Sequence, residues 1–223
     1  EVSEQKLLEA RQLEPEEPAI EFALAELYFT MREFRKAIAL YLDLIKQGIT
    51  QLSAVNLVER LGVAYANAGR FEQAIGYLKQ IHPGDMTPDV KFETGFTYLQ
   101  LKDYKPAIDL LTELKESDPH YTSLYPYLGQ ALVAENQLED ALKVLQEGLG
   151  VDQYNEKLWA YAADIAARLE DEDLTESYLK KGNELDADDL DIVIKLSNLY
   201  VKQGRWQDVI DFLTGYVKED NTD

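Results

Sequence analysis

The sequence contains no cysteine and only two histidines among its 223 residues. The lack of cysteine excludes disulfide bonds and thiolate metal sites, although it does not select a cellular compartment. A nucleophile with a histidine base would need His82 or His120, and each lies beside a proline in a predicted joint between helices. Carboxylates are plentiful, but no pattern indicates an enclosed pocket that would give two of them different pKa values, as acid–base catalysis requires. The sequence therefore predicts no enzyme, no cofactor and no metal site.

Basic residues are scarce as well, since 22 Lys and Arg stand against 42 Asp and Glu and give a formal net charge of −20. This charge repels phosphate backbones and anionic lipid surfaces, and no basic stripe with interleaved aromatics offsets it. We therefore expect no nucleic-acid ligand. A protein or peptide ligand is compatible with this charge, and a basic one is included. An acidic excess is also common in proteins whose charged surface is only solvated.

Long apolar runs are missing too. No stretch approaches the roughly 20 apolar residues that a membrane-spanning helix needs, so we expect no membrane span. Residue 1 is not methionine and no signal-peptide pattern follows it, which indicates a fragment whose native start is not seen. A cytoplasmic location is the default expectation.

What the sequence does contain is a repeated pattern, seen most clearly between Pro88 and Tyr121. Two amphipathic helices are predicted there, at about residues 90–100 and 104–116, with Gly95 and Tyr98 on the first and Ala107 on the second. The same arrangement of residues recurs along the chain. The small residues of its first helices are Ala25, Gly62, Gly95, Gly129, Ala163 and Ser197, which are 37, 33, 34, 34 and 34 residues apart. Fixed spacing in this range is the signature of a helical solenoid.

The second helix of each copy carries a bulky residue four positions after its own small residue. These bulky residues are Tyr41, Leu78, Leu111, Leu145, Leu179 and Leu213. With these features the chain resembles the tetratricopeptide repeat (TPR) family, whose unit is about 34 residues of helix-turn-helix. The resemblance is weakest at residues 170–175, where four acidic residues and Thr175 replace the expected turn and alanine, so we expect a local distortion there.

The resemblance implies an all-α, right-handed solenoid that forms one domain over residues 1–223. Its predicted parts are a half-repeat helix at 1–17, six repeats at 18–54, 55–87, 88–121, 122–155, 156–189 and 190–217, and a polar tail at 218–223. The extra residues of the longest step are expected in a loop between Gln47 and Ser53, with a bend at Gly48. Thr122 or Ser123 can cap the first helix of the fourth copy.

The resemblance also implies a concave groove. In TPR proteins it is lined by the residues three before, one after and four after the small residue of each first helix, which we call the groove stripe. We predict that the first three copies hold an extended or helical segment. The predicted contact residues, with two adjacent polar groups, are Phe22, Glu26, Phe29, Glu59, Val63, Asn67, Phe92, Phe96, Leu99 and Gln100. The later copies carry smaller stripe residues: Pro126, Gln130, Val133, Ala160, Asp164, Ala167, Ile194, Asn198 and Val201.

Two interpretations of the groove aromatics stay open, because aromatics at helical spacing are usually core residues. Phe22, Phe29 and Leu99 could pack between neighbouring repeats. Phe96 has charged or polar counterparts in most copies, so we predict that it faces solvent and that Phe96→Ala weakens partner binding with little change in melting temperature.

The predicted function is a scaffold that binds a peptide or protein segment in the groove. The alternative is a self-associating or regulatory arm of a larger enzyme or regulator. Both exposed ends of the solenoid would suit either further repeats or self-association.

Overall fold

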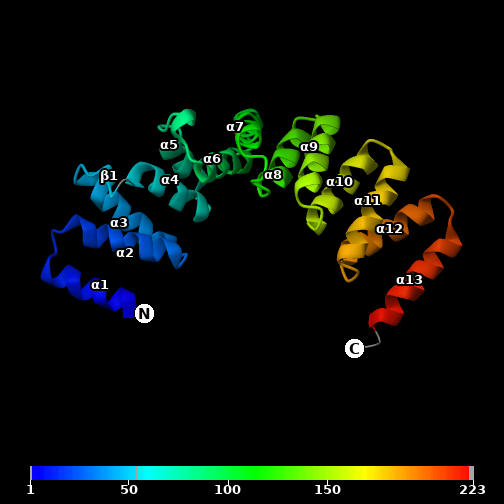
Figure 1. Ribbon diagram of the computed structural model, residues 1–223, viewed down its shortest axis with the longest axis horizontal. Coiled ribbons are helices and arrows are strands. Elements are labelled where there is room, and N and C mark those ends of the chain that lie inside the picture. The colour runs from blue at the N-terminus through cyan, green and yellow to red at the C-terminus, as the bar shows by residue number, and fades with distance from the viewer. Residues whose placement is uncertain (1, 54, 221–223) are drawn as a thin grey trace. The chain divides into compact units, whose positions relative to one another are not determined.

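The computed structural model describes residues 2–53 and 55–220, and within them thirteen α-helices account for nearly all regular structure (Figure 1). The helices are α1 (Val2–Leu13), α2 (Pro18–Thr30), α3 (Phe34–Lys46), α4 (Leu57–Asn67), α5 (Phe71–Leu78), α6 (Pro88–Gln100), α7 (Tyr104–Ser117), α8 (Leu124–Ala134), α9 (Leu138–Val151), α10 (Glu156–Arg168), α11 (Glu172–Leu185), α12 (Leu190–Lys202) and α13 (Trp206–Asp220). A short 3₁₀ helix η1 (Pro83–Asp85) and two strands, β1 (Gln51–Leu52) and β2 (Val55–Asn56), complete the described elements. The predicted all-α solenoid of helix-turn-helix repeats is confirmed.

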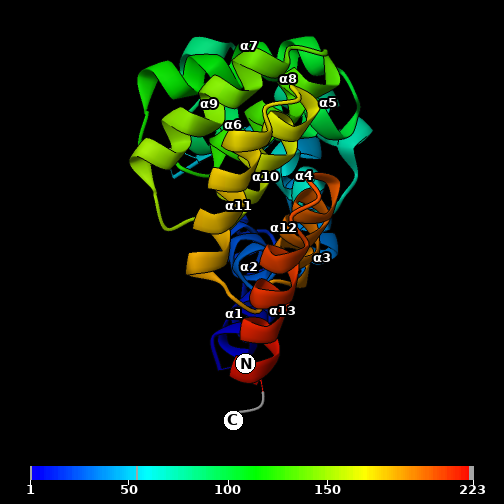
Figure 2. The same ribbon diagram turned by 90° about the vertical axis from the view of Figure 1, so that its right-hand side faces the viewer.

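The chain divides into two compact units, which we call unit 1 (residues 1–114) and unit 2 (residues 115–223). Within each unit, the two helices of a repeat pack against each other, as α2 does with α3 and α10 with α11. The second helix of a repeat also packs on the first helix of the next, as α3 does on α4 and α11 on α12 (Figures 1 and 2). The prediction of a single domain stays a prediction.

Close contact between the helices of one repeat explains the small residues. A Cβ atom placed on Gly62 would lie 2.7 Å from the side chain of Leu78, and one on Gly129 would lie 3.0 Å from Leu145. These leucines are 0 % and 1 % exposed. A larger residue at either glycine would therefore overlap a core side chain. The period of the small residues in the sequence is therefore the period of these contacts between the two helices of each repeat.

The turn inside each repeat is the same throughout. Its middle residue has positive φ, between 59° and 71°, at Arg32, Gly69, Lys102, Asn136, Glu170 and Gly204, which recur with the steps of the small residues. The predicted distortion at residues 170–175 is therefore wrong. Asp171 accepts a hydrogen bond from the backbone N–H of Leu174 at 2.9 Å, and the hydroxyl of Thr175 donates to the Asp171 carbonyl at 2.6 Å. The acidic run caps α11 instead of breaking the repeat.

The longest step of the repeat pattern is absorbed between α3 and α4. Gly48 has φ of +85° just after α3, which confirms the predicted bend, and β1 then pairs antiparallel with β2. Asn56 caps α4 by accepting from the backbone N–H of Val58 at 3.0 Å. Residue 54, the predicted end of the first repeat, lies outside the described residues.

Two boundary predictions differ from the structure. The side chain of Ser123 makes no hydrogen bond to the start of α8, because its backbone is already helical with φ of −63° and ψ of −20°. Helix α13 continues to Asp220, beyond the predicted repeat end at residue 217. The rest of the predicted polar tail, residues 221–223, lies outside the described residues. Among the helices described, none has the length and apolar character to cross a membrane.

Candidate functional site

The groove stripe of the first two copies lies on α2 and α4. Phe22, Phe29 and Val63 are half-buried and pack against the core of unit 1. The ring of Phe29 meets that of Phe34 edge-on, with centroids 5.6 Å apart, and the guanidinium of Arg60 lies 5.3 Å above it. These three predicted contact residues are therefore at least partly structural.

Glu26 is the main correction in this region, because its carboxylate is already paired inside the protein. It accepts a hydrogen bond from the buried Tyr41 hydroxyl at 2.5 Å and an ion pair from Arg60 of the next repeat at 3.0 Å. Burial, and next the bond to Glu26, raises the pKa of Tyr41 far above its usual value. The pair ties two repeats together, so Glu26 does not offer a free negative charge to a ligand.

The other polar groups predicted for the front of the groove are arranged around α4 and α6. Asn67 and Gln100 are exposed, while Glu59 is half-buried. Asn67 donates to the Val63 carbonyl at 3.0 Å and also reaches Glu93. Burial raises the pKa of Glu59, and the nearby Arg60 opposes this. Asn67 thus links neighbouring first helices.

Glu93 on α6 gives a pH-dependent prediction. Burial raises the pKa of its carboxyl above the reference value of 4.5, with Asp89 adding to the rise and the bond from Asn67 opposing it. The native state therefore holds this proton more tightly than the unfolded state, and the free energy of unfolding falls as the pH rises from 4.5 through the native pKa.

We expect Glu93→Gln to remove this pH-dependent loss of stability, because glutamine carries no charge and keeps an acceptor for Asn67. The variant should melt at a higher temperature than the wild type at about pH 7, and the difference should vanish at about pH 4. Melting curves at both pH values test this, with Glu116→Gln on the exposed side of α7 as a control for the lost charge. A variant that is less stable than the wild type at neutral pH would contradict the assignment.

The aromatic residues of α6 form a packed group. Phe96 is half-buried, with its ring stacked on Phe92 at 6.4 Å between centroids and set edge-on to Phe71 of α5 at 6.1 Å. Leu99 is 8 % exposed, so it is a core residue and the prediction of a contact role for it is wrong. Its counterpart Ala66 is also buried, at 3 %. Phe96 packs on two other rings, and aromatic pairs contribute roughly 0.5–1.5 kcal/mol each. The expectation that Phe96→Ala leaves the melting temperature unchanged is therefore revised.

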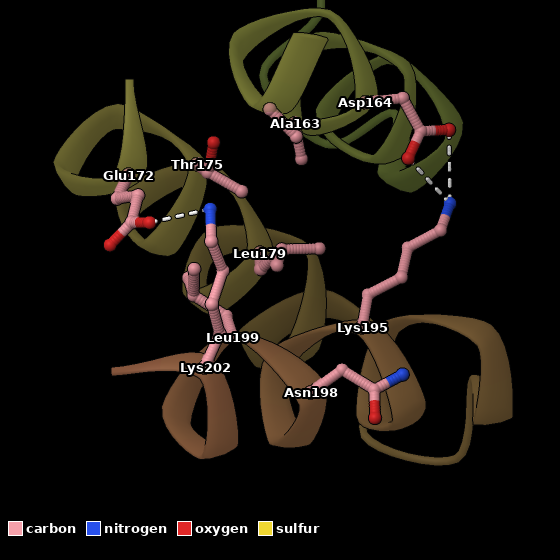
Figure 3. A pocket seen from close by; sticks show the side chains of 10 residues that line it. Ala163, Asp164, Glu172, Thr175, Leu179, Lys195, Asn198, Leu199 and Lys202 are labelled. Carbon is pink, nitrogen blue, oxygen red and sulfur yellow. Dashed lines mark hydrogen bonds and ion pairs between the residues drawn. The ribbon is translucent and has the colours of Figure 1, made fainter. Parts of the chain in front are cut away.

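The groove stripe of unit 2 lines two open cavities. A cavity of about 250 Å³ lies between α10, α11 and α12, and we call it the α10–α12 cavity (Figure 3). Its apolar floor includes Ala163, Leu179 and Leu199, which are 1 %, 2 % and 8 % exposed. The stripe residues Asp164, Ala167 and Asn198 line it.

Two ion pairs flank this cavity and join the fifth repeat to the sixth (Figure 3). Lys195 contacts both carboxylate oxygens of Asp164, at 2.7 and 2.9 Å, and Lys202 meets Glu172 at 2.6 Å. Burial would lower the pKa of Lys195, but its bonds to Asp164 and Asp191 outweigh this and raise it. The lining charges are thus neutralised by one another.

A second cavity, of about 340 Å³, lies one repeat earlier between α8, α9 and α10, and we call it the α8–α10 cavity. Leu145 and Ile165, 1 % and 5 % exposed, contribute apolar surface. Asp164 lines both cavities. Among the described residues, we find no hydrogen-bond partner for four lining side chains that could meet a ligand: Gln130, Tyr161, Arg168 and Asn198.

Sequence reasoning named most stripe residues of these cavities but favoured the front half. Space opens where side chains are small, as at Ala163 and Ala167, whereas the aromatic stripe residues Phe22 and Phe29 pack against the core of unit 1. Lys202 and Arg168 were missed because they lie beside the stripe, and only the packing of one repeat on the next brings them to a cavity. No group of three or more His, Asp or Glu residues in the described part of the chain is arranged to hold a metal ion.

Comparison with known proteins supports this repeat architecture. A family model described as YpiA-like tetratricopeptide repeats matches residues 1–49, and two tetratricopeptide repeat models match residues 57–86 and 89–121. The TPR repeat-containing protein YpiA of Bacillus subtilis (strain 168) is 36 % identical over 213 residues. The chain belongs to the tetratricopeptide repeat family. The match covers 96 % of this chain but only 50 % of YpiA, so this chain spans half the length of that relative.

Solved TPR structures share the fold at lower identity. YrrB, described as a TPR protein with an unusual peptide-binding site, is 18 % identical with a TM-score of 0.69, over 84 % of this chain and 95 % of YrrB. A structure of MamA is 18 % identical with a TM-score of 0.68, over 76 % of this chain and 92 % of MamA. The cavities described above therefore lie in a TPR array, each between the two helices of one repeat and the first helix of the next.

Proposed function

We propose that this TPR protein is a non-catalytic interaction scaffold that binds an extended peptide segment along the groove stripe of unit 2. The observation that carries the proposal is the pair of neighbouring cavities on α8, α10 and α12, which share Asp164. Cavities that recur from one repeat to the next suit a polypeptide ligand, because its side chains also recur at regular steps. The peptide-binding site named for YrrB lends support from a protein of the same fold.

The chemistry of the two cavities defines the peptide. Each apolar floor suits one aliphatic side chain, and burial of such a side chain contributes roughly 1.5–3 kcal/mol. The amides of Gln130 and Asn198 each offer a donor and an acceptor to the backbone of the peptide. Because Asp164 and Glu172 are neutralised by lysines, the contacts in the α10–α12 cavity favour apolar over charged side chains.

Charge acts at longer range. The net charge of −20 would speed the approach of a peptide with basic residues outside the cavities, an effect that salt weakens. We therefore propose apolar anchors flanked by basic residues as the ligand class. The Phe92–Phe96 pair of unit 1, with Phe22, Phe29, Glu59, Val63, Asn67 and Gln100, remains a proposed second contact surface. A cytoplasmic site of action is part of the proposal. A regulatory role within a longer protein is a second proposal, since YpiA is about twice as long as the matched region.

The test is to fill the α10–α12 cavity without disturbing the core. Ala167 lines this cavity and is exposed, whereas Ala134, exposed at the end of α8, lines neither cavity. Peptides would be selected from a random display library on the immobilised wild-type chain and their affinities measured by fluorescence polarisation. We expect Ala167→Leu to weaken the selected peptides about tenfold or more, and Ala134→Leu to leave them unchanged.

Three outcomes would count against the proposal. Equal binding to the wild type and to Ala167→Leu would remove the cavity from the binding site. Loss of binding only in Phe96→Ala would move the site to unit 1. A library that yields no binding peptide would argue against the ligand class itself.

A further inference from the structure

A further cavity, of about 550 Å³, lies in unit 1, and we call it the joint cavity. Two joints between helices form its walls together with the first turn of α4: the joint that holds β1 and β2, and the joint that holds η1. Of the groove stripe, only Glu59 lines it. The polar side chains of its lining include those of Gln51, Asn56, Glu59, Gln80, His82 and Asp85.

The joint cavity lies where the repeat departs from its period of 34 residues. The first step between small residues is 37 residues long and the second is 33, and both irregular joints line the cavity. The longer joint is tied to α4, because the backbone N–H of Leu57 donates to the Thr50 carbonyl at 2.9 Å. In the shorter joint, the ring of His82 accepts a hydrogen bond from the backbone N–H of Gly84 at 3.1 Å. The cavity therefore belongs to this sequence and not to the TPR repeat in general.

The charge of the joint cavity is negative. Glu59 and Asp85 line it, and no Lys or Arg side chain among the described residues does. Glu59 is half-buried, yet in the described part of the chain its carboxylate accepts no hydrogen bond and forms no ion pair. The adjacent Arg60 is instead paired with Glu26 at 3.0 Å. A partly desolvated carboxylate without a donor is unfavourable unless a ligand supplies one.

Other half-buried carboxylates of the array show the partner that Glu59 lacks. Glu176 meets Arg205 at 2.6 Å and Asp164 meets Lys195 at 2.7 Å. In both pairs the cation comes from the following repeat, as it does for Glu26. A cation is therefore the group that fits beside Glu59, and in the joint cavity it has to come from outside the described chain.

The rest of the lining favours a guanidinium group over an ammonium group. The amide nitrogen of Gln80 donates to the Gly76 carbonyl at 2.8 Å, which leaves the amide oxygen as an acceptor in addition to the two carboxylates. A planar guanidinium has five N–H donors for several acceptors, whereas an ammonium is a compact point charge. Val58 is half-buried and Ile81 is 9 % exposed, and both offer apolar contact to an aliphatic stem.

We propose that the joint cavity binds a guanidinium group on an aliphatic stem, with Glu59 and Asp85 as its counter-charges. Such a group comes either from an arginine side chain of a polypeptide or from a free guanidine compound. The ring of His82 carries its proton on Nε2 when neutral, since Nδ1 accepts from Gly84, and it can donate to a peptide carbonyl. We therefore expect the polypeptide as the source. The cavities of the proposed function lie in unit 2, so either proposal can fail without the other.

The experiment is an amide NMR titration of the isotope-labelled chain in about 0.15 M NaCl, which screens weak contacts with the acidic surface. The probes are a tripeptide with a central arginine and blocked ends, its citrulline analogue, which has the same shape without the charge, and agmatine, which has the guanidinium without the peptide. We expect saturable shifts around Gln51, Glu59 and His82 with the arginine tripeptide. Its affinity should exceed that of the citrulline analogue about tenfold or more and that of agmatine about threefold.

Glu59→Gln/Asp85→Asn should weaken the arginine tripeptide about tenfold or more, because it removes both counter-charges and keeps the side-chain shapes. Glu72→Gln/Asp109→Asn is the matched control, since both are exposed acids of unit 1 outside the joint cavity. It should bind the tripeptide like the wild type. The circular dichroism of both variants should match that of the wild type.

Equal affinity of the wild type and Glu59→Gln/Asp85→Asn would overturn the proposal, and so would equal affinity for the arginine and citrulline tripeptides. Shifts that do not saturate, or that spread over acidic residues outside the cavity, would reflect unspecific attraction to a net charge of −20 and would overturn it as well. Saturable binding of agmatine as strong as that of the tripeptide would support the guanidinium site and assign a free guanidine compound as its ligand.

Discussion

Replacing Leu78 with alanine should lower the free energy of unfolding by about 2–5 kcal/mol, the usual cost of a cavity in a packed core. Leu78 is fully buried and fits against the bare backbone of Gly62, so its truncation leaves a gap between the two helices of the repeat. Urea denaturation followed by far-UV circular dichroism measures the change.

The matched control is the same substitution at the same repeat position in the last copy. Leu213 is 37 % exposed, so Leu213→Ala should cost about 1 kcal/mol or less. Equal losses in the two variants would mean that the last repeat is covered as fully as the interior ones. That result would contradict the greater exposure of Leu213 in the structure.

Gly148→Ala should destabilise the protein by about 1–3 kcal/mol, although alanine is the better helix former. A Cβ atom at this position would lie 2.7 Å from Cγ and 2.8 Å from Cβ of Tyr125. That ring is 2 % exposed and is held by its hydroxyl, which donates to the Pro119 carbonyl at 2.7 Å. The ring has no room to move aside, so the overlap outweighs the gain in helix propensity.

Gly150→Ala, two residues further along α9, provides the control. A Cβ atom there meets nothing within 4 Å, so only the propensity gain of up to about 1 kcal/mol remains and the variant should be slightly stabilised. The opposite signs at two glycines of one helix are the expected result of thermal or urea denaturation. If Gly148→Ala is also stabilising, the close packing of α8 on α9 is wrong.

The repeat fold could be predicted from the sequence because one contact sets its period. Wherever two helices touch, a residue such as Gly62 must be small and one such as Leu78 must fill the space beside it. Both requirements are local in composition, so they can be read without coordinates. The left-handed turn residue could not be read in the same way, because Lys102 and Glu170 adopt a backbone more typical of glycine.

The candidate site was less predictable, because it depends on which side chains pair across repeats. Glu26 looked available until the structure brought Arg60 and Tyr41 to it. Phe96 looked exposed because most of its counterparts are polar, yet it is half-buried against the rings of Phe71 and Phe92. A pattern gives the face of a helix, but it does not tell whether a bulky side chain on that face fills a groove or lines it.

Hydrogen–deuterium exchange of the wild-type chain with a selected peptide tests the central claim most directly, since it requires no substitution. We predict slower exchange on peptide binding in α8, α10 and α12, around Gln130, Asp164 and Asn198, with little change in α3, α5 and α13. Protection confined to α2, α4 and α6 would place the ligand on unit 1. Protection on α13 without change in α10 and α12 would contradict the assignment of the unit 2 cavities as the binding site.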